Sequence, residues 1–497
     1  MGDDVTARIA GGWSRGNRLE RSLIPLLAAT ALGVYALVIV GATVSTTDGA
    51  AACSTWPSCD GRWLVPLDDT ALVVAMLHRM LSVIVGTTLL CTTAVAWAVR
   101  ADVASRGVLT LALGLYPVQI AIGAITATSM GTGAYPRAHL VLAMSIFATV
   151  LLALVWRLEH ETKDVESSFG HTEEGVDGAR NTAGQGGGGT VATAGDTVTT
   201  EPGFMARWGR RARAYGRLTK PRLMWLLCFV ALAGMGLATA TTGLPVSPAI
   251  VAGTLLGGVL AIGASGTFNH VLERDVDRRM ARTADRPTAT ADIPVRNALA
   301  FGTTLGIASL AVFIALVNEL AAVLGLTAIV FYSVVYTLVL KPNTSQNIVI
   351  GGAVGAIPAL IGWAAVTGSI GLPAVVLGVL IFLWTPAHFY NLALAYKRDY
   401  ERGGFPMLPL VRGEAVTFRH IALYFGATLL AAAFLGAIAP LGLWYATTVV
   451  VFAAVFLLAI VQLYRTRTPR AAFRSFHASN AFLGVVMVVI ILDTLLL

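Results

Sequence analysis

The sequence predicts an all-α, polytopic membrane protein, and three observations support this fold class. Of the 497 residues, 56% are hydrophobic and only 12% are charged. Apolar runs of about 20 residues, the length at which a helix crosses a bilayer, recur along the whole chain. The charged residues gather between these runs. Together these features are typical of a multi-span membrane protein rather than a soluble one.

The apolar runs predict two membrane domains that are joined by a linker. We expect a four-span module over residues 1–158, a flexible linker over 159–205 and a nine-span domain over 206–497. The linker contains four consecutive glycines and many small polar residues, which bury too little apolar surface to fold. The predicted spans lie near residues 23–46, 71–99, 106–128, 138–156, 223–242, 248–268, 297–316, 319–339, 347–367, 372–394, 420–438, 443–463 and 476–497.

The basic residues predict the orientation of the chain in the membrane. The net charge is +8, but lysine and arginine occupy alternate loops instead of one patch, so we expect no nucleic-acid partner. Arg8, Arg15 and Arg18 place the N-terminus in the cytoplasm. An odd number of spans then places the C-terminus outside. The prediction is a multi-pass protein of the cell membrane.

The first module carries four residues with possible chemistry. Cys53 and Cys59 lie in one external loop, where the compartment is oxidising and a disulfide is plausible. His78 and His139 lie near the outer ends of two spans, at matching depths. The two histidines could be axial ligands of one haem iron. The alternative is that each histidine caps a helix or bonds to a backbone carbonyl.

A dense polar stretch, residues 269–283, directly follows an apolar span of the second domain. On a helix Asn269, Glu273 and Asp277 are spaced at i, i+4 and i+8, so their side chains stack on one face, whereas Asp275 points elsewhere. An amide and two carboxylates form an oxygen-rich site suited to Mg²⁺. A solvated, salt-bridged surface is the competing interpretation.

A second acidic segment follows a later span, and the loop pattern puts it on the same side of the membrane. Asp399 is the expected further metal ligand and catalytic residue beside the first three. Arg278 and Arg282 in the first segment, with Lys397 and Arg398 in the second, are expected to bind a diphosphate, whose charge must be neutralised before its ester C–O bond ionises.

Two further residues, Lys220 and His388, are expected to contact substrate. Lys220 precedes the first span of the second domain, beside Pro221, and is either a plain membrane anchor or a contact to substrate. His388 lies in an apolar span, so it is either bonded within the helix bundle or faces a substrate cavity.

The second domain resembles the UbiA-type intramembrane prenyltransferases and, within them, the protohaem IX farnesyltransferase (haem O synthase) family. The resemblance rests on residues 219–221, 269–283, 286–287, 341–358, 384–389, 399–400 and 406–409. It implies a nine-helix bundle in which Mg²⁺ helps to transfer farnesyl from farnesyl diphosphate to a vinyl group of protohaem IX, giving haem O and diphosphate. It adds Lys341 to the expected substrate-binding residues. Implied partners are membrane lipid and haem A synthase or terminal oxidase assembly.

The sequence departs from that family at three positions. Glu273 stands where the family commonly has aspartate, which keeps the carboxylate. Arg398 stands where a second aspartate often precedes Asp399, and Gly403 where relatives with a full second acidic motif have their acid. Asp399 is therefore expected to be the main ligand from the second segment.

The first module, over about residues 25–157, resembles one half of haem A synthase, which is built of two four-span halves. The Cys-x5-Cys loop, the His78-Arg79 pair and His139 carry this resemblance. That family has a glutamate shortly before the His-Arg pair, and here Ala75 stands in its place. We therefore expect the module to bind haem or pass it on without oxidising it, or to serve as a membrane anchor.

Two other functions stay open at this point. The same metal chemistry could prenylate a quinone or chlorophyll precursor. A protein of a different class, a non-enzymatic haem carrier, would use the acidic segments as a cation gate.

Overall fold

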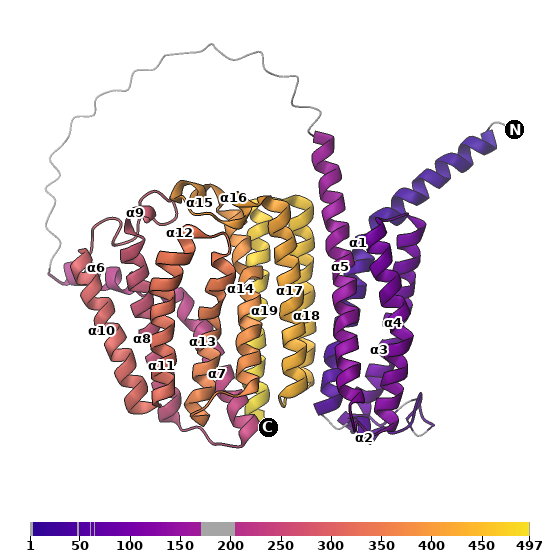
Figure 1. Ribbon diagram of the computed structural model, residues 1–497, viewed down its shortest axis with the longest axis horizontal. Helices are drawn as coiled ribbons and strands as arrows, with labels where there is room; N and C mark the ends of the chain where they lie inside the picture. Colours follow the sequence, from indigo (N-terminus) through magenta and orange to yellow (C-terminus); the bar gives the residue numbers. More distant parts are fainter. Residues whose placement is uncertain (1–2, 47–48, 60, 64, 170–203, 497) are drawn as a thin grey trace, which may run out of the picture.

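The computed structural model describes residues 3–46, 49–59, 61–63, 65–169 and 204–496. Within these ranges 13 helices are long and apolar enough to span a membrane, and no strand is present. The predicted all-α, multi-span fold class is confirmed. The helices form two bundles that stand side by side (Figure 1).

The first bundle is built from the N-terminal helices. Two aspartates begin its helices: the Asp69 carboxylate accepts a hydrogen bond from the Leu72 N–H (3.1 Å), and the Asp102 carboxylate accepts one from the Ser105 N–H (2.8 Å). The bundle consists of α1 (Asp3–Thr46), the short α2 (Gly49–Ala52), α3 (Thr70–Ala98), α4 (Val103–Thr128) and α5 (Tyr135–Phe169).

The helix boundaries around the expected linker differ from the prediction. Helix α5 continues to Phe169, past the boundary expected at residue 158, and the next helix begins at Phe204. The remainder of the expected linker, residues 170–203, lies outside the described residues.

The second bundle contains nine of the 13 candidate spans, because four belong to the first bundle. Within it α8 packs on α10, α7 on α13, α14 on α17 and α18 on α19. Its elements are α6 (Phe204–Leu218), α7 (Pro221–Thr242), α8 (Pro248–Leu272), α9 (Arg274–Asp277), α10 (Val295–Leu316), α11 (Glu319–Val330), the π-helix η1 (Phe331–Leu340), α12 (Lys341–Asn343), α13 (Asn347–Thr367), α14 (Leu372–Ala395), α15 (Lys397–Gly403), α16 (Leu408–Val411), α17 (Gly413–Ile438), α18 (Leu443–Thr466) and α19 (Pro469–Leu496).

Glycines let α7 and α13 meet backbone to backbone. A Cβ atom on Gly362 would overlap the carbonyl oxygen of Ala231, and one on Gly234 would overlap that of Ala359. Small residues at a membrane helix crossing permit this close approach. The crossing fixes the positions of two helices that later form the wall of a cavity.

The two bundles are joined through a packed interface. Helices α1 and α5 contact α17 and α18, and one hydrophobic core runs through both bundles. Gly426 on α17 leaves room for the Leu151 side chain of α5. The Arg419 guanidinium lies 3.4 Å from the Glu159 carboxylate across the same contact. The first bundle is thus attached on the side away from α8 and α9 (Figure 1).

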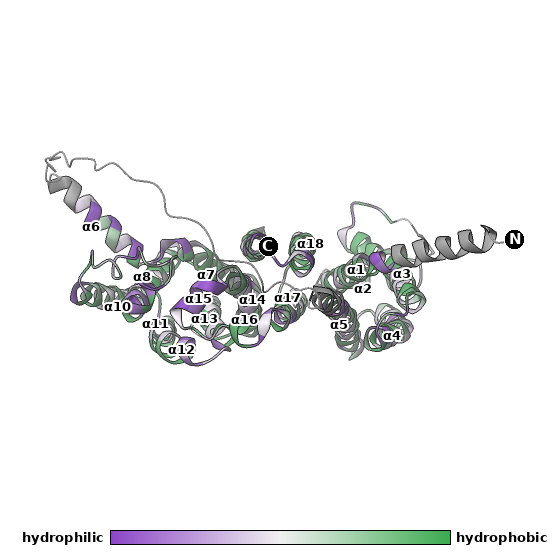
Figure 2. Cartoon of the chain, turned by 90° about the horizontal axis from the view of Figure 1, so that it is seen from above, coloured by the Kyte–Doolittle hydropathy of each residue, from purple (hydrophilic) through white to green (hydrophobic). Residues whose placement is uncertain are grey.

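Most of the polar segments of the second bundle share one end. Residues 269–294 and 396–413, with α9, α15 and α16, lie at the top of Figure 1, and we call this end the charged face. Figure 2 looks down on it and shows hydrophilic residues over α6 and α15. The two acidic segments, more than 100 residues apart in the sequence, therefore lie on the same side of the bundle.

Candidate functional site

The first acidic segment keeps its helical spacing through a break in the helix. Helix α8 ends at Leu272 and α9 begins at Arg274. The Glu273 N–H still donates to the Asn269 carbonyl (2.9 Å), and the Asp277 N–H donates to the Glu273 carbonyl (2.8 Å). The structure therefore brings Asn269, Glu273 and Asp277 together, all buried. Asp275 is exposed and bonds to the neighbouring Arg274.

Each buried carboxylate has a cation against it. The Lys341 ammonium donates to Glu273 Oε1 at 2.5 Å, and both side chains are largely buried, at 13% and 7% exposed. Arg286 Nη1 donates to both oxygens of Asp277 at 2.8 Å and lies 3.7 Å from Glu273 Oε2. A single arginine thus bridges the two carboxylates, which offsets the cost of burying them.

Lys220 joins the cluster from an unusual backbone position. Its φ is 54°, in the left-handed region, directly before Pro221. Gly266 on α8 allows the close approach, because a Cβ there would lie 3.0 Å from the Leu218 carbonyl oxygen. The ammonium then donates to the Asn269 side-chain oxygen and to the Tyr332 hydroxyl (3.2 Å). Strained backbone of this kind often accompanies functional sites.

The π-helix η1 supplies the opposite wall. Its wider turn is seen where the Thr337 hydroxyl donates to the Tyr332 carbonyl five residues earlier (2.8 Å). Asn269 Nδ2 donates to Thr337 Oγ1 at 3.1 Å. Lys341 follows directly after η1. One irregular helix therefore positions a hydroxyl, a phenol and an ammonium around α8.

The burial of these charges shifts their pKa values in different directions. Burial alone would raise the pKa of Glu273, but Lys341 and Lys220 outweigh it and hold that pKa below its usual value. Burial raises the pKa of Asp277, and Arg286 only partly opposes this. Burial, with the nearby Arg286, lowers the pKa of Lys220 to about 7. The protonation state of each group in the cluster therefore depends on the charges of its neighbours.

An apolar cavity of about 130 Å³ begins at this cluster. Lys220 and Tyr332 lie at its polar end, and the rest of its lining is almost entirely apolar. It extends between α7, α8, α11, η1 and α13, and its lining also includes Leu223, Leu227, Cys228, Ala231, Thr254, Leu255, Gly258, Ala261, Ile262, Ser265, Gly266, Ala328, Val354, Ile357, Pro358 and Ile361. A hydrocarbon chain whose charged end lies at the cluster would fit this polarity.

Asp399 joins the second acidic segment to the first. Its carboxylate accepts hydrogen bonds from the backbone N–H groups of Ala281 (3.3 Å) and Arg282 (3.0 Å), and Arg402 lies 3.4 Å away. The side chain is buried. In the described part of the chain, Asp399 therefore shares no hydrogen-bond or ion-pair partner with Glu273 or Asp277.

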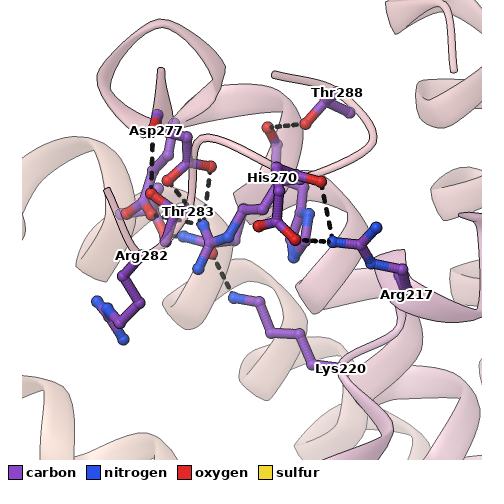
Figure 3. A network of polar contacts seen from close by, with 12 residues as sticks. Arg217, Lys220, His270, Asp277, Arg282, Thr283 and Thr288 are labelled. Atoms are coloured by element: carbon purple, nitrogen blue, oxygen red, sulfur yellow. Dashed lines mark hydrogen bonds and ion pairs between the residues drawn. The ribbon is translucent and has the colours of Figure 1, made fainter. Parts of the chain in front are cut away.

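The other expected diphosphate ligands lie apart from the cluster. Lys397 donates to Glu414 at 2.8 Å, and Arg398 is exposed. Arg278 donates to the Ala289 carbonyl (2.9 Å) and to Asp275 (3.3 Å). In Figure 3, Arg282 points away from Asp277 and its partners. The sequence shows that these residues lie close to the site along the chain, but it does not predict where their side chains point.

His388 lies in the packed core of the bundle. Its ring stacks between Trp384 (4.3 Å between ring centroids) and Phe476 (4.2 Å), and its Nδ1 lies 2.6 Å from the Ser479 hydroxyl oxygen. It lines neither the apolar cavity nor the cavity around α15. Its placement agrees with the alternative in which it is bonded within the bundle.

Two residues of the cluster were missed as site residues in the sequence. Arg286 bridges the carboxylates, and Tyr332 marks the polar end of the cavity. The Arg286-Pro287 pair, close after the acidic stretch, was a usable signal for the first. Tyr332 is one of many aromatic residues in apolar runs, so no local signal distinguishes it.

Oxygen donors dominate the cluster, which is the chemistry that Mg²⁺ prefers. Among the described residues no group of three or more His, Cys, Asp or Glu side chains lies close enough to hold a metal by itself. The amide and two carboxylates of residues 269, 273 and 277 are instead paired with cations. The donor set suits Mg²⁺ when a diphosphate supplies further oxygens and draws those cations toward itself.

The first bundle brings His78 and His139 together. Their ring centroids are 6.2 Å apart, and the Nδ1 atom of each is buried without a partner in the described part of the chain. The amide of Gln119 lies 3.3 Å from His139 Nε2, and its own Oε1 is also buried and unpartnered. These are buried polar groups of the kind a bound group would satisfy.

The external loop is held next to this pair. The structure joins Cys53 and Cys59 in a disulfide. The Arg79 guanidinium donates to the carbonyl groups of Cys53 (3.0 Å) and Ser58 (3.1 Å). Ala75 packs in the same small core as the two cysteines. Arg79 thus secures the loop, while the neighbouring His78 faces the bundle.

Two family models match different parts of the chain. The UbiA prenyltransferase family model matches residues 210–486, which include the acid–base cluster and the apolar cavity. The chain therefore belongs to the UbiA prenyltransferase family. The model of a cytochrome oxidase assembly protein family matches residues 24–175. The second match covers the first bundle, so the fusion inferred from the sequence is confirmed.

Curated relatives share both parts. Protoheme IX farnesyltransferase of Haloarcula marismortui is 57% identical, over 96% of this chain and 99% of its own. That of Halobacterium salinarum is 54% identical, over 95% of this chain and 98% of its own. A solved UbiA homolog from Archaeoglobus fulgidus, bound to DMAPP and Mg²⁺, is 17% identical over 57% of this chain and 98% of its own, with a TM-score of 0.44.

The bridging role of Arg286 gives a test of the cluster. Replacing it by glutamine leaves Asp277 and Glu273 buried without their shared cation, so Arg286→Gln should lower the free energy of unfolding by about 3 kcal/mol. Arg217→Gln is the matched control, because Arg217 forms an exposed pair with Asp285 (2.6 Å) and should change stability by less than about 0.5 kcal/mol. Equilibrium unfolding in detergent measures both. Equal effects would contradict the bridging role.

Proposed function

We propose that the chain transfers the farnesyl group of farnesyl diphosphate to a vinyl group of protohaem IX, giving haem O and diphosphate. The observation that carries this proposal is the buried acid–base cluster at the polar end of an apolar cavity. Support for the acceptor comes from the names of the relatives that match nearly the full chain. The same relatives favour protohaem over a quinone or chlorophyll precursor.

The cluster accounts for the ionisation of the donor. Lys220, Lys341 and Arg286 place three cations next to one another, where the six or more oxygens of a diphosphate would bind. Asn269, Glu273, Asp277 and Asp399 are the proposed holders of Mg²⁺, which supplies further neutralisation of the diphosphate when bound.

Farnesyl transfer replaces a C–O bond of the donor by a C–C bond to the acceptor. The allylic C–O bond of the donor breaks, and its electron pair leaves with diphosphate. The vinyl π electrons form the new C–C bond, and water adds to the resulting carbocation beside the macrocycle with loss of a proton. The apolar cavity keeps water from the allylic cation before it meets the acceptor.

The charge pattern of the loops supports a cytoplasmic location for the charged face. Both substrates would then be bound from the cytoplasmic side of the cell membrane, with the farnesyl chain held among the helices. We also propose that the product serves terminal oxidase assembly, because the first bundle matches a cytochrome oxidase assembly family.

The direct experiment incubates the purified chain with farnesyl diphosphate, protohaem and Mg²⁺. Haem O identified by mass, together with released diphosphate, is the expected result. Diphosphate release only with a quinone precursor would favour the other acceptor class. Haem binding without diphosphate release would favour a carrier.

The carboxylates give a sharper test within this assay. Glu273→Gln and Asp277→Asn should each lower kcat by a factor on the order of 10²–10³, because each removes a hard anionic group with almost no change in volume. Asp399→Asn should also lower it. Asp275→Asn is the matched control, since Asp275 belongs to the same segment but is exposed. Near-normal turnover of the first two at saturating Mg²⁺ would remove the metal assignment.

The apolar cavity should set the preferred donor length. Gly258 lines it, and a Cβ atom there meets nothing within 4 Å, so the side chain of Gly258→Leu would project into open cavity space. We expect the ratio of kcat/KM for a 15-carbon donor to that for a 10-carbon donor to fall by roughly tenfold. Gly114→Leu, at an equally open position in α4, should leave the ratio unchanged. An unchanged ratio in both variants would place the hydrocarbon chain of the donor outside this cavity.

For the first bundle we propose haem binding by His78 and His139. The two imidazole rings, whose centroids lie 6.2 Å apart, would supply the nitrogens that hold the haem iron. Gly41 and Gly123 leave room for the rings, because a Cβ on either would lie within 3 Å of an imidazole carbon. When bound, haem would satisfy the unpartnered nitrogens.

Spectroscopy of the full chain with added protohaem tests this site. His78→Ala and His139→Ala should each remove the low-spin absorbance of a bis-imidazole iron. His160→Ala, an exposed histidine on the same helix as His139, is the control. Unaltered spectra in all three would leave the bundle as a membrane anchor.

A further inference from the structure

A second cavity opens on the charged face, and of the residues proposed to act on the donor only Asp399 lines it. Its volume is about 1060 Å³, and it shares no lining residue with the apolar cavity. Helix α15, the starts of α17 and α19, the end of α18 and the turn at residues 281–282 surround it. Glu273, Asp277 and Lys341 do not line it.

The lining of this cavity is amphiphilic. Leu394, Phe418, Leu463 and Ala472 contribute apolar surface. Charged side chains of both signs also line it: Arg282, Lys397, Arg398, Asp399, Glu401, Glu414 and Arg467. A ligand that fits it would have a broad apolar body and a charged edge.

The charges of the lining do not all cancel. Asp399 is bonded to the backbone N–H groups of the 281–282 turn, and Glu414 pairs with Lys397. The guanidinium of Arg282 lies over the rings of Tyr396 (4.9 Å) and Tyr400 (5.6 Å) and has no carboxylate partner among the described residues. The Arg398 and Glu401 side chains make no hydrogen bond or ion pair in the described part of the chain. Because basic residues outnumber acidic ones in the lining, the cavity favours an anionic ligand.

Two aromatic rings link this cavity to the acid–base cluster. Tyr400 lies beneath Arg282, and its ring faces Phe405 at 6.5 Å between centroids. The Lys341 ammonium lies 4.4 Å from the centre of the Phe405 ring and pairs with Glu273. A ligand in contact with Arg282 would thus be separated from the Lys341–Glu273 pair by the rings of Tyr400 and Phe405.

We propose that this cavity binds the acceptor, with Arg398 and Arg282 pairing with the two propionates of protohaem and the apolar lining contacting the macrocycle. The proposal rests on the proposed function, and it reassigns these two arginines from the donor to the acceptor. Two substrates then approach the cluster from two separate cavities.

The test compares protohaem with its dimethyl ester, which lacks both propionate charges. In the unmodified full chain, haem product formation should show a KM for the free acid roughly tenfold below that for the ester. Arg398→Gln should raise the KM for the free acid by about the same factor, leave the KM for farnesyl diphosphate unchanged, and abolish the discrimination between acid and ester. Arg282→Gln should act in the same direction.

Arg279→Gln is the matched control, since Arg279 is exposed on the same segment and lines neither cavity. It should retain the discrimination. If Arg398→Gln raises the KM for farnesyl diphosphate and leaves the KM for protohaem unchanged, Arg398 binds the donor and the proposal is overturned. If Arg398→Gln raises the KM for the acid and for the ester equally, Arg398 binds another anion, such as a lipid headgroup, and the proposal is also overturned. No product from the unmodified chain would remove the proposed function itself.

Discussion

The arrangement of the second bundle depends on the pairing of buried carboxylates with cations at a helix end. Glu273 and Asp277 lie at the boundary of a membrane span and are almost fully buried. An unpaired charge there would cost several kcal/mol, so Lys341 and Arg286 must come from other parts of the chain to meet them. This requirement draws the end of the η1 segment and the loop after α9 toward α8. The cluster holds the charged face together before any substrate binds.

The same pairing explains why the cluster is suited to ionising a diphosphate. In the proposed reaction, the cations that neutralise the carboxylates in the free protein become available to the phosphate oxygens of the donor, and the carboxylates become available to a metal ion. Little reorganisation of the helices is needed, because the exchange takes place among side chains that already touch.

The second bundle separates hydrocarbon from charge along its length. The close crossing of α7 and α13 at Gly234 and Gly362 forms one wall of the apolar cavity, and the acidic loops form its charged end. Asp399 joins the two loops by accepting backbone hydrogen bonds. The first bundle is attached on the opposite side, through α17 and α18 (Figure 1).

The sequence by itself determined the helical class, the two-part organisation and the acidic segments, because these follow from local composition and from the regular spacing of a helix. The spacing of Asn269, Glu273 and Asp277 survives the break at residue 273, since the backbone hydrogen bonds still link residues four apart. Tertiary structure alone decided that Arg286 and Lys341 face these carboxylates, that Arg282 turns to the other cavity and that His388 is stacked in the core. These contacts depend on which distant helix packs beside each residue. Packing across the whole bundle sets this, whereas the residues next to it in the sequence do not.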